Sequence, residues 1–142
     1  MRNIIFKSVL VLLCFLSSFH AAIGKEFIID NKANKTCIVY DARGSALDSI
    51  AAYLLQQDIK TVLGYLAPVY TNLSKASGNC IVIGNINSAL VRSVIAGQDV
   101  MFSNLQGKWE CYGYKVLNKP VGHINQALVI AGSDTRGTAY GV

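Results

Sequence analysis

The sequence predicts an α+β (α/β) fold, a mixed sheet of about five strands with two to three helices packed over one face of it. Short apolar runs bounded by turn residues predict the strands, and one long stretch with apolar residues every three or four positions predicts a helix. Strands and helices alternate in the middle of the chain, while both ends are hairpin-like. The 142 residues are 52% apolar and 15% charged, a composition that excludes a disordered chain.

Residues 1–24 have the pattern of an export signal. Arg2 and Lys7 supply positive charge, Val9–Leu16 is an uninterrupted apolar run, and small residues suited to a signal peptidase end at Gly24. A membrane-spanning helix requires roughly 20 apolar residues, and this run ends at Ser17. We therefore expect a mature chain of residues 25–142, periplasmic or extracellular, without a stable membrane anchor. The alternative is an uncleaved anchor.

The charge of the chain does not indicate a nucleic-acid partner. The sequence has 13 Lys+Arg and 8 Asp+Glu, a formal net charge of +5. Removal of Arg2 and Lys7 with the export signal leaves 11 basic residues and a charge of +3. These cations are scattered, whereas nucleic-acid binding requires clustered cations that displace counterions from phosphates. We expect no nucleic-acid partner.

The first part of the mature chain predicts two strands and a long helix. Residues 27–29 and 36–40 are short apolar runs joined by a polar turn. A helix follows, with Ser45 as its expected N-cap and Gly64 as its expected end. Its apolar positions recur at the helical period and are expected to form the buried face. They are Leu47, Ile50, Ala51, Leu54, Ile59, Val62, Leu63 and Leu66.

The middle of the chain predicts two further strands and a shorter helix. Pro68 prevents the long helix from continuing and leads into a short strand at Val69–Tyr70. A polar loop then precedes a continuous apolar strand at Cys80–Ile83. A turn that starts at Gly84 leads into a helix over 90–95. The sequence contains neither a Walker A loop nor a G-x-G-x-x-G motif, so this turn is not a specific phosphate-binding signal.

The last third of the chain predicts a hairpin and the start of a helix. Glu110–Leu117 and Gln126–Ala131 are strand-like and are joined by a segment rich in turn formers. Ser133 or Asp134 is suited to cap the helix that follows. The sequence stops at Val142 shortly after that helix begins, and we interpret the chain as a fragment or as the opening domain of a longer protein.

The cysteines and the histidine of the mature chain do not predict a metal site. Cys37, Cys80 and Cys111 are odd in number, so at least one thiol is unpaired. Cys37 and Cys80 lie in apolar runs, where cysteine often acts as a small buried hydrophobe; we expect buried thiols with at most one disulfide, and the pairing is left open. There is no C-x-x-C pair, and His123 stands alone in a turn. We expect neither a metal nor a cofactor.

Few side chains are candidates for catalysis or binding. No serine lies in a G-x-S-x-G elbow, and most carboxylates fall in turns or at helix starts. Glu110 and Asp134 are the most interesting carboxylates because they border Trp109 and the final turn. The plain structural interpretation is that Glu110 begins a strand and Asp134 caps a helix. Trp109, the only tryptophan, is suited either to stack on a sugar ring or to anchor a core or an interface.

Two stretches of the sequence resemble the N-terminal domain of glycoside hydrolase family 115. They are Gly107-Lys108-Trp109-Glu110 and residues 127–142, which include the run Gly132-Ser133-Asp134-Thr135-Arg136-Gly137. Residues 58–64 and 81–84 also look like that domain, so the resemblance covers residues 25–142. The members of this family are secreted bacterial α-glucuronidases that remove glucuronic or 4-O-methylglucuronic acid from xylan side chains.

The resemblance implies a non-catalytic α/β domain ahead of a TIM barrel that carries the catalytic carboxylates. Its expected partners are that barrel, in the same polypeptide, and glucuronoxylan. We expect no catalytic residue and no glycosidase activity in this chain alone. The candidate residues for a substrate cleft or a domain interface are Asn85, Trp109, Glu110, Asp134 and Arg136. The alternative is a free-standing secreted carbohydrate-binding or adhesion module, with Trp109 as a stacking surface.

Overall fold

The computed structural model describes residues 26–31, 34–95 and 100–142. The expected export signal at 1–24 lies outside these ranges. The described chain forms a five-stranded mixed sheet in the order β4-β3-β5-β7-β6, which confirms the predicted fold class. The strands of this sheet are β3 (Cys37–Tyr40), β4 (Val69–Tyr70), β5 (Gly78–Asn85), β6 (Tyr112–Asn118) and β7 (Ile124–Gly132).

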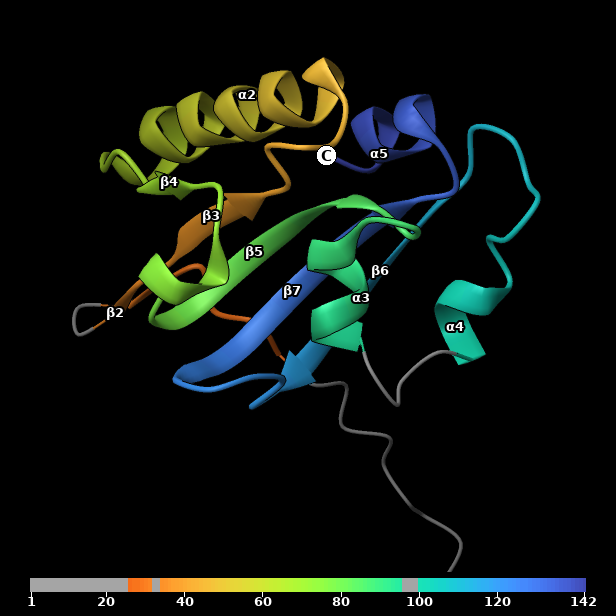
Figure 1. Ribbon diagram of the computed structural model, residues 1–142. Helices are drawn as coiled ribbons and strands as arrows, with labels where there is room; N and C mark the ends of the chain where they lie inside the picture. The colour runs from red at the N-terminus through yellow and green to blue at the C-terminus, as the bar shows by residue number, and fades with distance from the viewer. Residues whose placement is uncertain (1–25, 32–33, 96–99) are drawn as a thin grey trace, which may run out of the picture.

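The helices cover both faces of the sheet (Figure 1). Four α-helices are described, where the sequence predicted two to three: α2 (Ala46–Leu63), α3 (Ala89–Ile95), α4 (Val100–Ser103) and α5 (Thr135–Gly141). A short 3₁₀ helix, η1 (Leu73–Lys75), lies in the predicted polar loop. Figure 1 shows α2 and α5 side by side above the sheet, with α3 and α4 on the opposite face.

Four neighbouring strands of the sheet are parallel, and only the edge strand β6 is antiparallel. β5 pairs in parallel with β3 on one side and with β7 on the other. β6 and β7 form the predicted hairpin, although β6 begins at Tyr112 rather than at Glu110. The predicted strand at 27–29 is absent; instead β1 (Asp30–Asn31) and β2 (Asn34–Lys35) form a separate antiparallel pair inside the expected polar turn.

The expectation that helices lie over one face was wrong, because β3, β5 and β7 are apolar on both sides. Successive residues of a strand point to opposite faces. Ile38 and Ile81 pack with Ile59 of α2, whereas Val82 and Val129 belong to the core on the other face. The residues of α3 and α4 that complete this second core are Val91, Val94, Ile95 and Phe102. Central parallel strands therefore have continuous apolar sequences, because helices pack against both of their faces.

The ends of α2 are those predicted from the sequence, but its buried face differs from the predicted one. Ser45 is the N-cap in a capping box with Asp48, and Gly64 ends the helix in the left-handed region at φ +75°. The residues that face the sheet are Asp48, Ala51, Ala52 and Ile59. Of the eight apolar positions expected to be buried, Ala51 and Ile59 are, and the other six are exposed. Two alanines, Ala51 and Ala52, lie on the buried face, and their small side chains allow the helix to approach the sheet closely. The larger apolar residues lie on the exposed face.

Candidate functional site

All five candidate residues lie at one edge of the sheet, where the parallel strands end. β5 ends at Asn85 and β7 at Gly132, and these two residues are register partners. β6 runs the other way, so its first residue, Tyr112, is also paired with Gly132. The segments before β6 and after β7 therefore meet at the carboxyl edge. Ligands of open α/β sheets commonly bind at this edge.

Four of the candidates lie together in a group that we call the terminal cluster: Trp109, Glu110, Asp134 and Arg136. Hydrogen bonds join Glu110 to Asp134 and to Arg136, and Trp109 lines one hollow with Glu110 and Arg136. Asp134 is the N-cap of α5, as predicted, and its Oδ1 accepts a hydrogen bond from the N–H of Gly137 at 2.7 Å. Its Oδ2 accepts another from the N–H of Glu110, also at 2.7 Å. A single carboxylate thus caps α5 and holds the segment before β6 against it.

The hydrogen bonds of Asp134 favour its ionised form. The N–H of Glu110, followed by that of Gly137, lowers the pKa of the Asp134 carboxyl, because both stabilise the ionised form. An aspartate held in this way accepts hydrogen bonds and is poorly suited to donate a proton at neutral pH. Ser133 adds a second link between the same segments, because its Oγ accepts from the Cys111 N–H at 3.1 Å and its N–H donates to the Cys111 carbonyl at 2.8 Å.

Glu110 has a backbone conformation that explains why β6 starts late. Its φ of +55° lies in the left-handed region, which non-glycine residues seldom adopt and which a strand cannot include. The Glu110 side chain accepts a hydrogen bond from Arg136, with Oε1 and Nη1 2.8 Å apart. This bond and the negative charge of Glu110 raise the pKa of Arg136. The strained residue is thus held by Asp134 at its backbone and by Arg136 at its side chain.

Trp109 is 79% exposed, so the core role considered for it is wrong. With Glu110 and Arg136 it lines a shallow hollow of about 290 Å³. The hollow therefore combines an aromatic face, a carboxylate and a guanidinium. Such a set suits either a sugar ring or the surface of another domain, since both bury apolar area beside polar groups.

Two glycines of the quoted motif allow α5 to lie against the sheet edge. A Cβ on Gly137 would collide with the carbonyl oxygen of Cys111, and a Cβ on Gly132 would collide with the backbone nitrogen of Thr138. Both positions therefore require glycine for a close backbone approach. The sequence contains the glycines but does not indicate what they contact. Gly137 contacts Cys111, more than 20 residues away, and Gly132 contacts Thr138 of the following helix.

Asn85 lies at the same edge but lines a different hollow, of about 410 Å³. Its Oδ1 accepts from the N–H of Asn87 at 2.7 Å, and within the described ranges no hydrogen bond joins it to the terminal cluster. Asp41 and Arg43 line the same hollow and were not predicted. Both residues follow shortly after the end of β3. Polar residues just after a buried strand are a sequence signal for a site at this edge of the sheet, and that signal could have identified them.

No cysteine is among the described residues that line these hollows. Cys37 and Cys80 are buried register partners on β3 and β5, and Cys111 is partly exposed; all three are free thiols. Burial raises the pKa of Cys80 to about 12. Among residues 26–31, 34–95 and 100–142, no group of three or more His, Cys, Asp or Glu side chains is placed to hold a metal ion. None of the helices described is long and apolar enough to cross a bilayer.

Comparison with known proteins gives a structural relative. No protein-family model matches the chain, and no curated protein matches it. Among solved structures, the chain is similar to a family GH115 4-O-methyl-α-glucuronidase described as having specificity for decorated arabinogalactans. The two are 28% identical with a TM-score of 0.56, over 75% of this chain and 12% of that enzyme. The chain is therefore similar, in sequence and in fold, to a small part of a GH115 glycoside hydrolase.

Proposed function

We propose that the chain is the non-catalytic N-terminal domain of an exported α-glucuronidase-like glycoside hydrolase that acts on glucuronoxylan side chains. The observation that carries this proposal is the similarity to 12% of a GH115 enzyme over 75% of this chain. The motif residues support it, because hydrogen bonds join Glu110 to Asp134 and to Arg136, and Trp109 lines one hollow with Glu110 and Arg136. The catalytic barrel would belong to the same polypeptide.

The terminal cluster is suited to binding and positioning rather than to glycoside hydrolysis. Hydrolysis requires two carboxyl groups that face one bond, with one of them able to donate a proton. The Asp134 carboxylate is held ionised by two N–H groups, and Glu110 is paired with Arg136. Asp134 is therefore poorly suited to act as a general acid, and the Glu110 side chain is engaged by Arg136. We propose that the cluster instead contacts the barrel domain, with Trp109 as the apolar centre of the contact.

The activity of the whole protein tests the proposal. The chain alone is expected to release no uronic acid from glucuronoxylan, whereas the polypeptide extended through the following coding sequence is expected to release it. Decorated arabinogalactan is the comparison substrate, given what the similar enzyme is described to act on. Release by the chain alone, or no release from either polysaccharide by the extended polypeptide, would contradict the proposal. N-terminal sequencing of the exported protein is expected to begin at Lys25.

A second function, polysaccharide binding by the chain itself, is favoured by the exposure of Trp109. If Trp109 stacks on sugar rings, Trp109→Ala should abolish binding of the chain to glucuronoxylan, and the indole emission should shift to the blue on titration of the polysaccharide. Tyr114→Ala is the matched control, because Tyr114 is an exposed aromatic residue on β6 outside the hollow. Absence of binding, or equal losses in the two variants, would exclude this function.

A further inference from the structure

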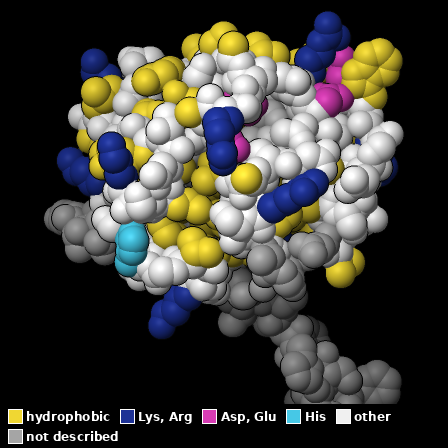
Figure 2. Space-filling view, in the orientation of Figure 1, with side chains coloured by type: hydrophobic (Ala, Val, Ile, Leu, Met, Phe, Trp, Pro, Cys, Tyr) yellow, Lys and Arg dark blue, Asp and Glu magenta, His cyan; other side chains and the backbone are white. Residues whose placement is uncertain are grey.

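The outer side of α2 is apolar along its first half, although it faces solvent. Four residues there, which we call the α2 patch, are between 36% and 61% exposed: Leu47, Ile50, Tyr53 and Leu54. Leu47, Ile50 and Leu54 are spaced i, i+3 and i+7, so they line one side of the helix. Figure 2 shows hydrophobic side chains gathered along the top of the molecule, where Figure 1 places α2. Because the inner side of α2 packs on the sheet, the helix is apolar on two sides, as is typical of a helix that is covered on both.

The α2 patch carries no charged side chain. The only charged residue between Ala46 and Gln57 is Asp48, which is buried. Exposed polar residues begin beyond the patch, with Gln57, Asp58, Lys60 and Thr61. Apolar patches of this kind on a surface mark interaction sites. The occupant should itself be apolar and uncharged, because a charge placed against the patch would lose its hydration without gaining a partner.

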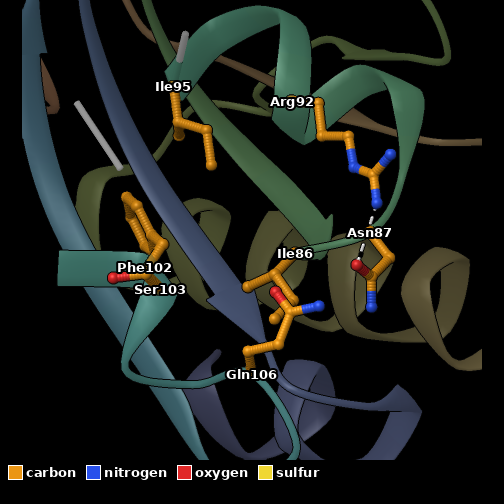
Figure 3. A pocket seen from close by; sticks show the side chains of 7 residues that line it. All are labelled: Ile86, Asn87, Arg92, Ile95, Phe102, Ser103 and Gln106. Atoms are coloured by element: carbon orange, nitrogen blue, oxygen red, sulfur yellow. Dashed lines mark hydrogen bonds between the residues drawn. The ribbon is translucent and has the colours of Figure 1, made fainter. Parts of the chain in front are cut away.

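The helix α3, on the opposite face of the sheet, has the ordinary pattern of a surface helix. Val94 and Ile95 of α3 are buried, and Arg92 is exposed. Figure 3 shows these two kinds of side chain around a hollow of about 450 Å³ beside α3. The apolar residues described in its lining are buried in the core, and the polar ones are exposed. The α2 patch departs from this pattern, so exposure of apolar side chains there requires its own explanation.

The helix α5 leads from the terminal cluster to the α2 patch. α5 packs beside α2 (Figure 1). Its Tyr140 is 59% exposed and lies four residues after Arg136, on the same side of the helix. Val142 directly follows α5, and Figure 1 shows this point beside the first turns of α2. Polypeptide that continues from Val142 would therefore begin next to the patch.

We propose that the α2 patch binds an apolar, uncharged surface of the polypeptide that follows Val142. That such polypeptide follows rests on the proposed function, and this chain covers only 12% of the similar enzyme. The covalent connection favours this occupant over a second copy of the chain, because a tethered surface meets the patch at a high effective concentration. The contact proposed for the terminal cluster then extends across α5 onto α2.

Hydroxyl-radical footprinting with mass spectrometry tests the occupant, because oxidation of a side chain requires access to solvent. In the chain alone, the four residues of the α2 patch are expected to be oxidised readily. In the polypeptide extended through the following coding sequence, they are expected to be oxidised several-fold more slowly. The measurement is independent of uronic-acid release. Release without protection of the patch would contradict this inference alone, whereas protection without release would support it and contradict the proposed function.

Lysine variants of the extended polypeptide test whether the patch itself makes the contact. The double variant Ile50→Lys/Leu54→Lys is expected to raise the oxidation of Tyr53 several-fold, toward the rate in the chain alone. Val62→Lys is the matched control, because Val62 is 78% exposed on the same helix but lies beyond the polar residues that follow the patch. It is expected to leave the protection of Tyr53 unchanged.

Three results would overturn the proposal. The first is equal oxidation of the α2 patch in the chain alone and in the extended polypeptide. The second is unchanged protection of Tyr53 in the double lysine variant, or an equal loss of protection in Val62→Lys. The third is protection that rises with protein concentration together with a dimeric mass in light scattering, which would make a second copy the occupant.

Discussion

Asp134 connects two parts of the chain that are 24 residues apart in the sequence. Its two carboxylate oxygens each accept one backbone N–H, from Glu110 and from Gly137, at 2.7 Å. The first bond fixes the strained turn before β6, and the second satisfies an N–H at the start of α5 that has no partner within the helix. The charge of this one side chain therefore stabilises the whole terminal cluster.

Asp134 should make the stability of the protein depend on pH in the acidic range. Its pKa is lowered in the folded state, so its contribution is present above the unfolded pKa, roughly 3.9, and is lost as the pH falls through the lower, folded pKa. Asp134→Asn retains a capping oxygen but loses one acceptor and the titration. It should be less stable than the wild type at pH 7, and the difference should narrow below pH ~4 in urea unfolding experiments.

The control for this prediction is Asp58→Asn, which removes an exposed carboxylate of α2. That variant should remain close to the wild type at each pH. An Asp134→Asn protein that unfolds with the same free energy as the wild type at both pH values would show that the two N–H bonds do not stabilise the ionised form.

Gly137 provides a second test at the residue scale, in which helix propensity and tertiary contact make opposite predictions. Alanine favours a helix over glycine by about 1 kcal/mol, so propensity alone predicts that Gly137→Ala stabilises α5. The added Cβ would instead collide with the Cys111 carbonyl oxygen. We expect destabilisation of about 1–3 kcal/mol, typical of overpacking, measured by denaturant unfolding.

Gly64→Ala is the matched control, because a Cβ there meets no atom within 4 Å and only the φ of +75° is unfavourable. We expect a cost of about 1 kcal/mol at this position. If Gly137→Ala costs no more than Gly64→Ala, the close approach of α5 to the segment before β6 does not occur in solution.

At the scale of one element, α2 shows how far periodicity alone predicts packing. Its cap at Ser45 and its end at Gly64 follow from local chemistry, and both were predicted correctly. Its buried face was wrong because apolar residues occur on more than one side of the helix, and size decides which side meets the sheet. Ala51 and Ala52 face the sheet, while Leu54, at 61% exposure, does not. Figure 2 shows hydrophobic side chains along the top of the molecule, over α2.

A pair of truncations on α2 distinguishes the observed face from the predicted one. Ile59 is 4% exposed and packs in the core under the helix, so Ile59→Ala should cost about 2–5 kcal/mol. Leu54→Ala should change the free energy of unfolding by no more than about 0.5 kcal/mol, as for other surface positions. Comparable losses in the two variants would mean that the helix buries the face that the sequence predicts.

At the scale of the whole molecule, the sequence predicts the class of fold better than its layers. The five strands and their mixed character follow from apolar runs and turn residues. The second helical layer was missed, although the unbroken run Cys80–Ile83 was predicted correctly as a continuous apolar strand. Such a run has an apolar residue on each face, and only the pairing of β5 with both β3 and β7 shows that both faces need cover.

The residues that the sequence singles out lie at one edge of the sheet, but the sequence did not indicate their geometry. The motif resemblance named Trp109, Glu110, Asp134 and Arg136, and the structure brings them together. Their contacts depend on the register of β6 with β7 and on the position of α5 against the segment before β6, which are tertiary features. The left-handed backbone of Glu110 has no local sequence signal, because glutamate seldom adopts it. Asn85 lies at the same sheet edge but lines another hollow, which also depends on tertiary structure.

The position of β5 between β3 and β7 governs when the sheet can be completed during synthesis. β3 leaves the ribosome before β5, but β7, which pairs with the whole other edge of β5, ends at Gly132. At roughly 5–20 residues per second, the apolar edge of β5 has no partner for several seconds. Translocation of the Sec type threads unfolded chains, so in the exported protein proposed above this delay lengthens the interval in which the chain can be threaded. During this interval the unpaired edge of β5 is the kind of strand edge to which another chain can add.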